Sequence, residues 1–141
     1  MQMPDVNILV YAHRAESEHH GRYAEWLRKV ATGPEPFALS ELVMQGFVRI
    51  VTNPRIFDPP STAAEALRFL NELTDRPRCA VLRAGSGNWA IFEQLCRKDG
   101  IRGKLVADAA HAALAIEYGC EWVTADTDFG RFAPLLRWRH L

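Results

Sequence analysis

Short apolar segments alternate along the chain with longer amphipathic ones, and this alternation limits the possible folds more than any other feature. The apolar segments have the length and aliphatic character of strands buried on both faces of a sheet. Helix-like segments of about 10–15 residues separate most of them. We therefore predict an α/β fold with a central parallel sheet of about four or five strands flanked by helices. The predicted strands are residues 5–12, 37–40, 79–82 and 121–125, with a weaker one at 135–141.

The predicted helices start and stop at recognisable signals. Ser40 is a suitable N-cap for a helix over residues 41–52, which Pro54 must end. Thr62 and Glu65 have the spacing of a capping box and begin the next helix. The other helices are predicted at residues 20–31, 88–100 and 105–118, the second closed by Gly100 and the third followed by Gly119.

Length and composition favour one domain covering residues 1–141, because 141 residues with 48% hydrophobic content suffice for a single core. No apolar run reaches the roughly 18 residues of a membrane span, and the N-terminus lacks the pattern of a signal peptide. We expect a cytoplasmic protein with no membrane partner and with reduced cysteines. The 17 basic and 17 acidic residues balance, so any contact with nucleic acid must be local.

Five acidic residues that are far apart in the sequence lie where predicted elements begin or end. Carboxylates at the ends of parallel strands meet in one crevice. Buried together they would repel one another, so a compensating cation is expected. An all-oxygen set suits Mg²⁺, with Mn²⁺ as the alternative. The predicted metal ligands are Asp5, Glu41, Asp108, Asp126 and Asp128.

Each acid taken alone also has a structural explanation. Asp5 could be an edge carboxylate satisfied by backbone N–H groups, and Glu41 is favoured in the first turn of any helix. Asp126 could cap a short helix. The joint placement favours a site, in which Asn7, two residues after Asp5 on the same strand face, could orient Asp5 or a bound water. His111 stands three residues after Asp108 and could share its helix face.

A crevice of this kind predicts hydrolysis of phosphate esters. A metal ion activates the attacking water and stabilises the leaving oxygen, as in nucleases and phosphatases. A phosphatase of the HAD type would need an aspartate at Asn7, and a receiver domain would need an acceptor aspartate after residues 79–82. Neither requirement is met.

Four segments together resemble the PIN-domain family, and within it the VapC-type ribonuclease toxins of bacterial toxin-antitoxin modules. The resemblance implies a PIN fold and an Mg²⁺- or Mn²⁺-dependent endoribonuclease. It also implies that Asp5, Glu41, Asp108 and Asp126 are catalytic, that Asp128 is an accessory acid, and that Asn7 and Thr124 support them by hydrogen bonding. One departure is Val6, where the family more often has a hydroxyl residue. The segments are DVNILVYA, SELVMQGFVRIVTNPRIF, DAAHAALAIEYG and TADTDFGRF.

The resemblance further implies a small antitoxin that covers the site, often by inserting an Arg or Lys, and a homodimer or a hetero-oligomer with the antitoxin. The alternative is an inert PIN-fold module that binds RNA or protein without cleaving, although such a module would be expected to have lost acids that this chain retains. RNA contacts are expected from local cations and aromatic rings. The candidates are Arg14, Arg49, Arg55, Arg102, Lys104, Trp89, Phe129 and Trp138.

Overall fold

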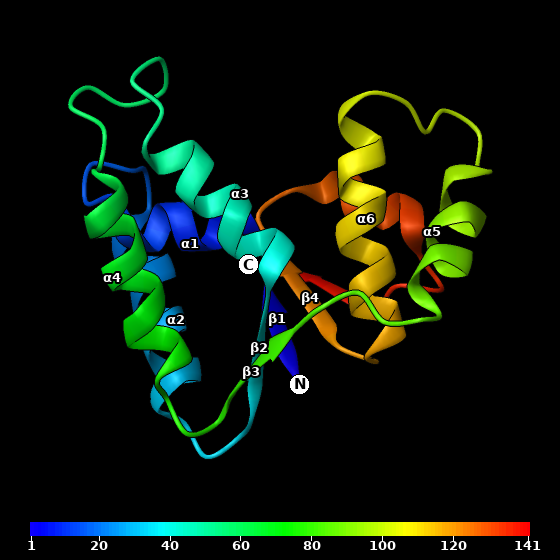
Figure 1. The fold of residues 1–141 in the computed structure, drawn as a ribbon, viewed down its shortest axis with the longest axis horizontal. Coiled ribbons are helices and arrows are strands. Elements are labelled where there is room, and N and C mark those ends of the chain that lie inside the picture. The colour runs from blue at the N-terminus through cyan, green and yellow to red at the C-terminus, as the bar shows by residue number, and fades with distance from the viewer.

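The computed structural model describes all residues from 1 to 141 and shows a parallel sheet between two groups of helices (Figure 1). Helices α1 to α4 gather on one side, and α5 and α6 lie on the other. In order, the elements are β1 (Gln2–Pro4), α1 (Val6–His13), α2 (His20–Thr32), β2 (Phe37–Ser40), α3 (Glu41–Val51), α4 (Ala63–Thr74), β3 (Cys79–Leu82), α5 (Asn88–Cys96), α6 (Lys104–Glu117), β4 (Glu121–Thr124), the 3₁₀ helix η1 (Thr127–Phe132) and β5 (Trp138–His140).

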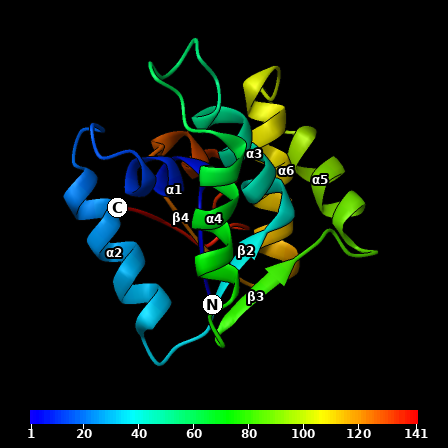
Figure 2. The ribbon, with the colours of Figure 1, turned by 60° about the vertical axis from the view of Figure 1, so that its left-hand side comes forward.

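The five strands are all parallel and lie in the order β3-β2-β1-β4-β5. Figure 2 shows β3, which forms one edge of the sheet, beside β2. The chain builds outward from β1 in one direction as far as β3 and then returns to the other side of β1 with β4. The strand order therefore reverses between β1 and β4, and the carboxyl ends of these two strands border the crevice where α/β sheets place their sites.

The prediction of a strand over residues 5–12 is wrong. The strand is Gln2–Pro4, and residues Val6–His13 form helix α1, with Asp5 as its N-cap. The apolar run has few polar residues because α1 is covered by α2 and α3 as well as by the sheet. A short helix buried on most sides has the same composition as a buried strand, so periodicity does not separate the two.

The other predicted elements are confirmed, with shifted ends. Ser40 Oγ accepts a hydrogen bond from the Val43 amide at 3.1 Å, and Thr62 Oγ1 accepts one from the Glu65 amide at 3.1 Å. Helix α5 ends at Cys96, before the predicted Gly100, and the weak C-terminal strand is present as β5. The three cysteines are free thiols, as expected. No helix has both the length and the apolar character needed to cross a bilayer.

Small residues bring two helices close to the site. Helix α6 packs against β4 and η1 with fully buried Ala109, Ala112 and Ala113, and its alanine face holds the helix near the strand ends. In α3, a Cβ on Gly46 would lie 3.0 Å from Val6 Cγ2, so this glycine permits the close crossing of α3 over the start of α1. Both contacts bring a helix close to the carboxyl ends of β1 and β4.

Candidate active site

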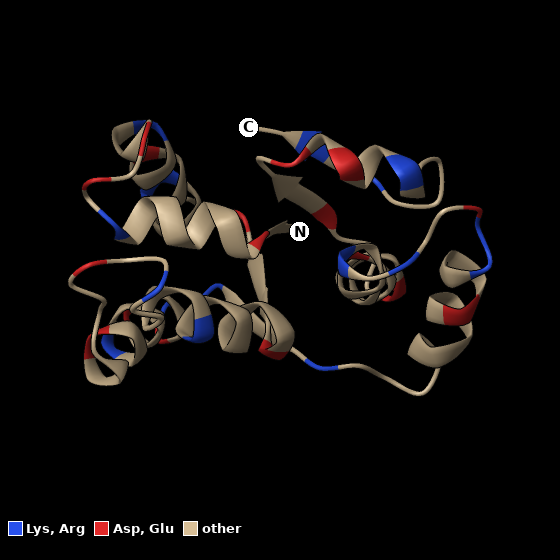
Figure 3. Cartoon of the chain, turned by 90° about the horizontal axis from the view of Figure 1, so that it is seen from above, with Lys and Arg blue, Asp and Glu red and all other residues tan.

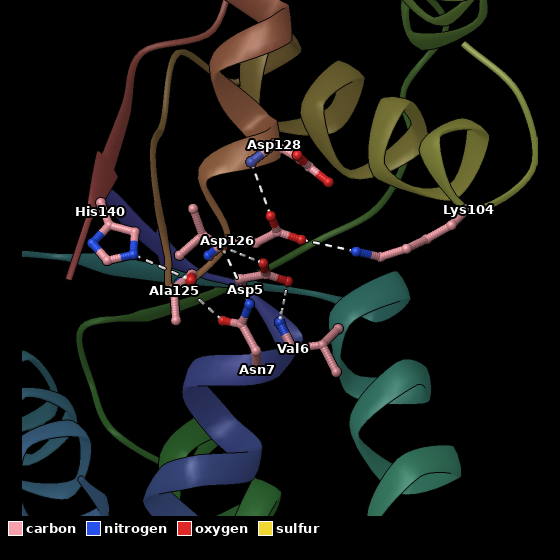
Figure 4. A network of polar contacts seen from close by, with 9 residues as sticks. Asp5, Val6, Asn7, Lys104, Ala125, Asp126, Asp128 and His140 are labelled. Atoms are coloured by element: carbon pink, nitrogen blue, oxygen red, sulfur yellow. Dashed lines mark hydrogen bonds and ion pairs between the residues drawn. The ribbon is translucent and has the colours of Figure 1, made fainter. Parts of the chain in front are cut away.

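A hydrogen bond from Thr124 Oγ1 to the Asp5 carboxylate joins the carboxyl ends of β1 and β4. Figure 4 shows Asp5 within this network of polar contacts. The Asp5 amide donates to the Val123 carbonyl at 2.8 Å, which continues the β1–β4 ladder by one residue. The Asp5 carboxylate is buried, and Oδ1 accepts from the Val6 amide at 2.6 Å while Oδ2 accepts from Thr124 Oγ1 at 2.6 Å. The position of Asp5 therefore follows from its role as strand end and helix cap together.

Thr124 is the centre of the hydrogen-bond network around this carboxylate. Its Oγ1 also accepts from Asn7 Nδ2 at 3.3 Å and from the Asp126 amide at 2.9 Å. Asn7 Oδ1 in turn accepts from the Ala125 amide at 3.2 Å. The two residues predicted to support the site thus tie the first turn of α1 to the segment after β4.

Asp126 is the N-cap of η1, as the sequence suggested. Oδ1 accepts from the Asp128 amide at 2.9 Å, and Oδ2 accepts from Lys104 Nζ at 2.8 Å. Figure 4 shows Lys104 reaching Asp126 from α6. The prediction that Lys104 contacts RNA did not include this ion pair, which joins residues 22 apart in the sequence.

Asp108 differs from Asp5 and Asp126 because its buried oxygen has no hydrogen-bond donor. The side chain is buried on α6, and Oδ2 makes no hydrogen bond. His111 Nδ1, one turn further along α6, is also buried without a partner, and the ring stacks on Trp122 with 5.5 Å between centroids. Burial lowers the pKa of His111 to about 4, so the imidazole is neutral.

Asp5, Asp108 and Asp126 line one cleft of about 620 Å³ together with Asn7, Lys104 and His111. Asp128 is exposed and does not line this cleft, and only its backbone amide is connected to it, through the hydrogen bond to Asp126 Oδ1. Glu41 is not brought to this cleft. Its Oε1 accepts from Arg83 Nε at 2.6 Å, and the residue lines a separate groove between α3 and α4.

The carboxyl groups of the cleft have unequal proton affinities. Burial raises the pKa of Asp5 to about 6 against the opposing hydrogen bonds from Thr124 and Val6, and the charges of Asp108 and Asp126 raise it further. Burial also raises the pKa of Asp108. The pKa of Asp126 is lowered, because hydrogen bonds from Lys104 and from the Asp128 amide outweigh its partial burial. The same ion pair raises the pKa of Lys104.

These features fit a divalent cation bound by oxygen ligands. Asp108 Oδ2 is a buried acceptor without a donor, and burial, with a smaller contribution from the charges of Asp108 and Asp126, raises the pKa of Asp5. Two predicted ligands are held by cations of the chain itself, Asp126 by Lys104 and Glu41 by Arg83. In this arrangement no three acidic, histidine or cysteine side chains surround a single metal position. Occupancy by a metal would therefore require side-chain rearrangement within the cleft.

The aromatic residues suggested for RNA contact have different surroundings. Phe129 is buried in the core, so stacking of a base on it is excluded. Trp89 is exposed on α5 and pairs with Phe92, away from the cleft, and Trp138 lines a hollow that Trp26 also lines. Basic and acidic residues both occur in each of the two groups of helices (Figure 3).

This cleft lies at the carboxyl ends of β1 and β4, where the strand order of the parallel sheet reverses, which is the usual place for a site in an α/β domain. The family model of the PIN domain matches residues 3–135. A VapC ribonuclease of Mycobacterium bovis is 41% identical over 96% of this chain and 92% of its own length. Ribonuclease VapC31 of Mycobacterium tuberculosis is 34% identical over the whole chain and 97% of its own length. The chain therefore belongs to the PIN-domain family, among its VapC ribonucleases.

Solved structures show the same fold. VapBC2 from Rickettsia felis, crystallised with a promoter DNA fragment, matches with a TM-score of 0.71 and 21% identity, covering 99% of this chain and 97% of that one. VapC20 of Mycobacterium tuberculosis, described as a toxin that cleaves the sarcin-ricin loop, matches with a TM-score of 0.68 and 18% identity over 94% and 95% of the two chains. The likeness confirms a PIN-like parallel sheet flanked by helices.

Proposed function

We propose that the chain is an Mg²⁺-dependent endoribonuclease, with Mn²⁺ as a possible substitute, and the toxin of a type II toxin-antitoxin pair. The observation that carries this proposal is the convergence of Asp5, Asp108 and Asp126 on one cleft, with Asp108 Oδ2 buried and unpaired. Its VapC ribonuclease relatives support the choice of RNA as the substrate.

The chain's own residues have distinct tasks in this reaction. Asp5, Asp108 and Asp126 would hold the metal, with Glu41 and Asp128 as further ligands. A divalent ion held there would polarise a water for attack and stabilise charge on the phosphate. Thr124 and Asn7 fix the orientation of the Asp5 carboxylate and of the segment after β4 through the bonds described above. Outer hydrogen bonds of this kind hold ligating carboxylates in place.

Lys104 has a second task once a metal is bound. Its ammonium now compensates Asp126, with 70% of the side chain exposed. A divalent ion at Asp126 removes the need for this pair, and the flexible lysine is then available to a phosphate oxygen of the RNA. Glu41 becomes available by the analogous loss of its exposed pair with Arg83.

The proposed partners follow from the relatives rather than from the cleft. Two of the similar structures are VapBC complexes, which supports a small antitoxin bound to this chain in the cytoplasm. A homodimer, or a hetero-oligomer with the antitoxin, is the proposed assembly. The apolar groove between α3 and α4 is one surface that such a contact could cover.

Cleavage of total RNA with and without Mg²⁺ tests the function. We expect Mg²⁺-dependent cleavage that EDTA stops. Asp5→Asn and Asp108→Asn should each lower the cleavage rate about a thousandfold, because a metal stabilises the transition state by several kcal/mol. Asp75→Asn, an exposed aspartate at the end of α4, is the matched control and should cleave normally. Cleavage that persists in both cleft variants contradicts the metal role, and binding without cleavage by the wild type favours the inert module.

A further inference from the structure

The cleft has a second wall that the hydrolysis itself does not use. Opposite the acids, the cleft is lined by Arg49 and Ile50 from α3 and by Ile56 and Phe57 from the loop that follows it. We propose that this wall is a subsite for one unpaired nucleotide of single-stranded RNA next to the cleaved phosphodiester. Arg49 binds the backbone phosphate, and Ile56 with Phe57 contacts the base. This inference rests on the proposed ribonuclease function and adds the recognition element to it.

Arg49 is the unpaired cation of the cleft. Its side chain is exposed on α3 and makes no ion pair or hydrogen bond within the chain, whereas Lys104 on the opposite wall is paired with Asp126. An arginine left without a carboxylate partner beside a metal-binding cleft is suited to a phosphate, whose oxygens match the planar guanidinium. Because Arg49 and Asp108 line the same cleft, a phosphate bound by Arg49 would belong to the RNA segment that enters the cleft.

Ile56 supplies an apolar surface beside this cation. It is 53% exposed, although it has a large aliphatic side chain. Single exposed apolar residues are common on proteins. Ile56 is distinguished by its position next to Phe57 on the wall of a cleft that Asp108 and Arg49 also line. A nucleotide offers the matching chemistry, because the face of its base is flat and weakly hydrated while its phosphate is charged.

Arg14 fixes the loop between α3 and α4 through contacts with three of its residues. Its guanidinium donates to Ser61 Oγ at 3.0 Å and to the Pro59 carbonyl at 2.9 Å, and lies 4.4 Å from the centroid of the Phe57 ring. Only 12% of the Arg14 side chain is exposed, and Glu16 neutralises it. The sequence analysis assigned Arg14 to RNA, but the structure makes it a positioning residue for the loop.

The loop is also fixed from within. The amides of Ile56 and Phe57 both donate to the Asn53 carbonyl, at 3.0 and 3.1 Å, and the Ser61 amide donates to the Val51 carbonyl at 2.8 Å. A loop ordered before binding loses little conformational entropy when a ligand arrives. An ordered loop also presents Ile56 and Phe57 in fixed positions, so its contact with a base can depend on the shape of that base.

RNA binding without cleavage tests the phosphate contact. Full-length Asp108→Asn protein would be titrated with a fluorescent single-stranded RNA oligonucleotide in Mg²⁺ at several salt concentrations. Adding Arg49→Gln should weaken binding about tenfold and make it less dependent on salt, because one phosphate contact is lost. Arg68→Gln, an exposed arginine on α4 outside the cleft, should leave binding unchanged. Unchanged affinity in Arg49→Gln would overturn the phosphate contact, while loss of cleavage in Asp108→Asn reports on the catalytic proposal separately.

Base preference tests the apolar part. Cleavage rates would be compared for oligonucleotides that differ in the base at one position near the cut. The ratio between the best and the worst base should shrink about fivefold in Ile56→Ala, because the apolar contact with the base is lost. Leu67→Ala, which is similarly exposed at 50% on α4, is the matched control. Arg14→Gln should flatten the preference in the same way, and thermal unfolding would show whether its fold is intact. Unchanged preference in Ile56→Ala, which removes only an exposed side chain, means that the wall serves a protein contact and overturns the proposal.

Discussion

The acidic residues predicted to bind the metal fall into two groups that are held in different ways. Asp5 and Asp126 accept two hydrogen bonds each from defined donors and are linked through Thr124. Asp108 has a buried oxygen with no partner, and Glu41 is turned toward Arg83. The first group is fixed by bonds close to the ends of β1 and β4. The second group, Asp108 on α6 and Glu41 on α3, has no such bonds to the ends of β1 and β4.

This difference indicates how such a cleft tolerates its own charge. Backbone amides and one threonine stabilise the first pair at fixed positions. In the second group, burial raises the pKa of Asp108, and an ion pair with Arg83 neutralises Glu41 outside the cleft. Substitutions at these residues and at their hydrogen-bond partners test this contrast.

The largest effect concerns the pH dependence of stability. The folded-state pKa of Asp5 is about 6 against an ordinary value of 3.8, so the folded protein binds the proton more tightly than the unfolded chain. The stabilisation from this group is therefore complete below pH 4 and is lost as pH rises through 6. The unfolding free energy of wild type relative to Asp5→Asn should fall by roughly 2–3 kcal/mol between pH 4 and pH 7.5.

Urea unfolding of both proteins in metal-free buffer measures this difference. Mg²⁺ at pH 7.5 should recover most of the loss in the wild type and little in Asp5→Asn, because a cation replaces the proton. A difference that stays constant across the pH range would show that Asp5 is ionised in the fold at no cost, and that the first group needs no metal.

Loss of the central hydroxyl should affect catalysis next. Thr124→Val keeps the shape of the side chain but removes the donor to Asp5 and the acceptor for Asn7 and the Asp126 amide. We expect kcat/KM for RNA to fall about 10–100-fold, as for other residues that orient metal ligands. Thr32→Val, at the end of α2, is the control. Full activity in Thr124→Val would mean that the prearranged group does not depend on this network.

Glu41 and Arg83 form a matched pair of tests for the second group. If Glu41 turns to the metal on binding, Glu41→Gln should lower Mg²⁺-dependent cleavage about tenfold or more, while Arg83→Gln leaves cleavage intact. Each change should alter stability by less than about 1 kcal/mol, because the pair is largely exposed. Equal and negligible effects on cleavage from both variants would remove Glu41 from the site.

The smallest effect concerns Lys104. Its ion pair with Asp126 competes with a metal, so Lys104→Gln should tighten Mg²⁺ binding severalfold, an amount consistent with an exposed pair. Isothermal titration calorimetry without RNA would measure this directly. Lys98→Gln, whose ammonium bonds carbonyls of the segment after β4 instead, is the control. Weaker metal binding in Lys104→Gln would mean that the lysine organises the acids rather than competing for them.

Much of the fold could be predicted because its signals are local. The caps at Ser40 and Thr62, the strand of residues 37–40 and the five-strand parallel sheet are all present. Residues 5–12 were misassigned because their burial comes from helices α2 and α3, which no local pattern reports. Asp5 nevertheless lies at the crevice, because the same residue ends β1 and caps α1.

The sequence by itself determined the alternation of strands and helices, the identity of the acids and their placement at the ends of elements. Those properties depend on backbone caps and on hydrophobic patterns a few residues long. Only the tertiary structure decided that Asp108 is unpaired, that Arg83 and Lys104 engage Glu41 and Asp126, and that Arg14 fixes the loop opposite the acids. The Lys104–Asp126 pair joins residues 22 apart in the sequence, and the Glu41–Arg83 pair joins residues 42 apart. How the layers pack decides whether such side chains meet.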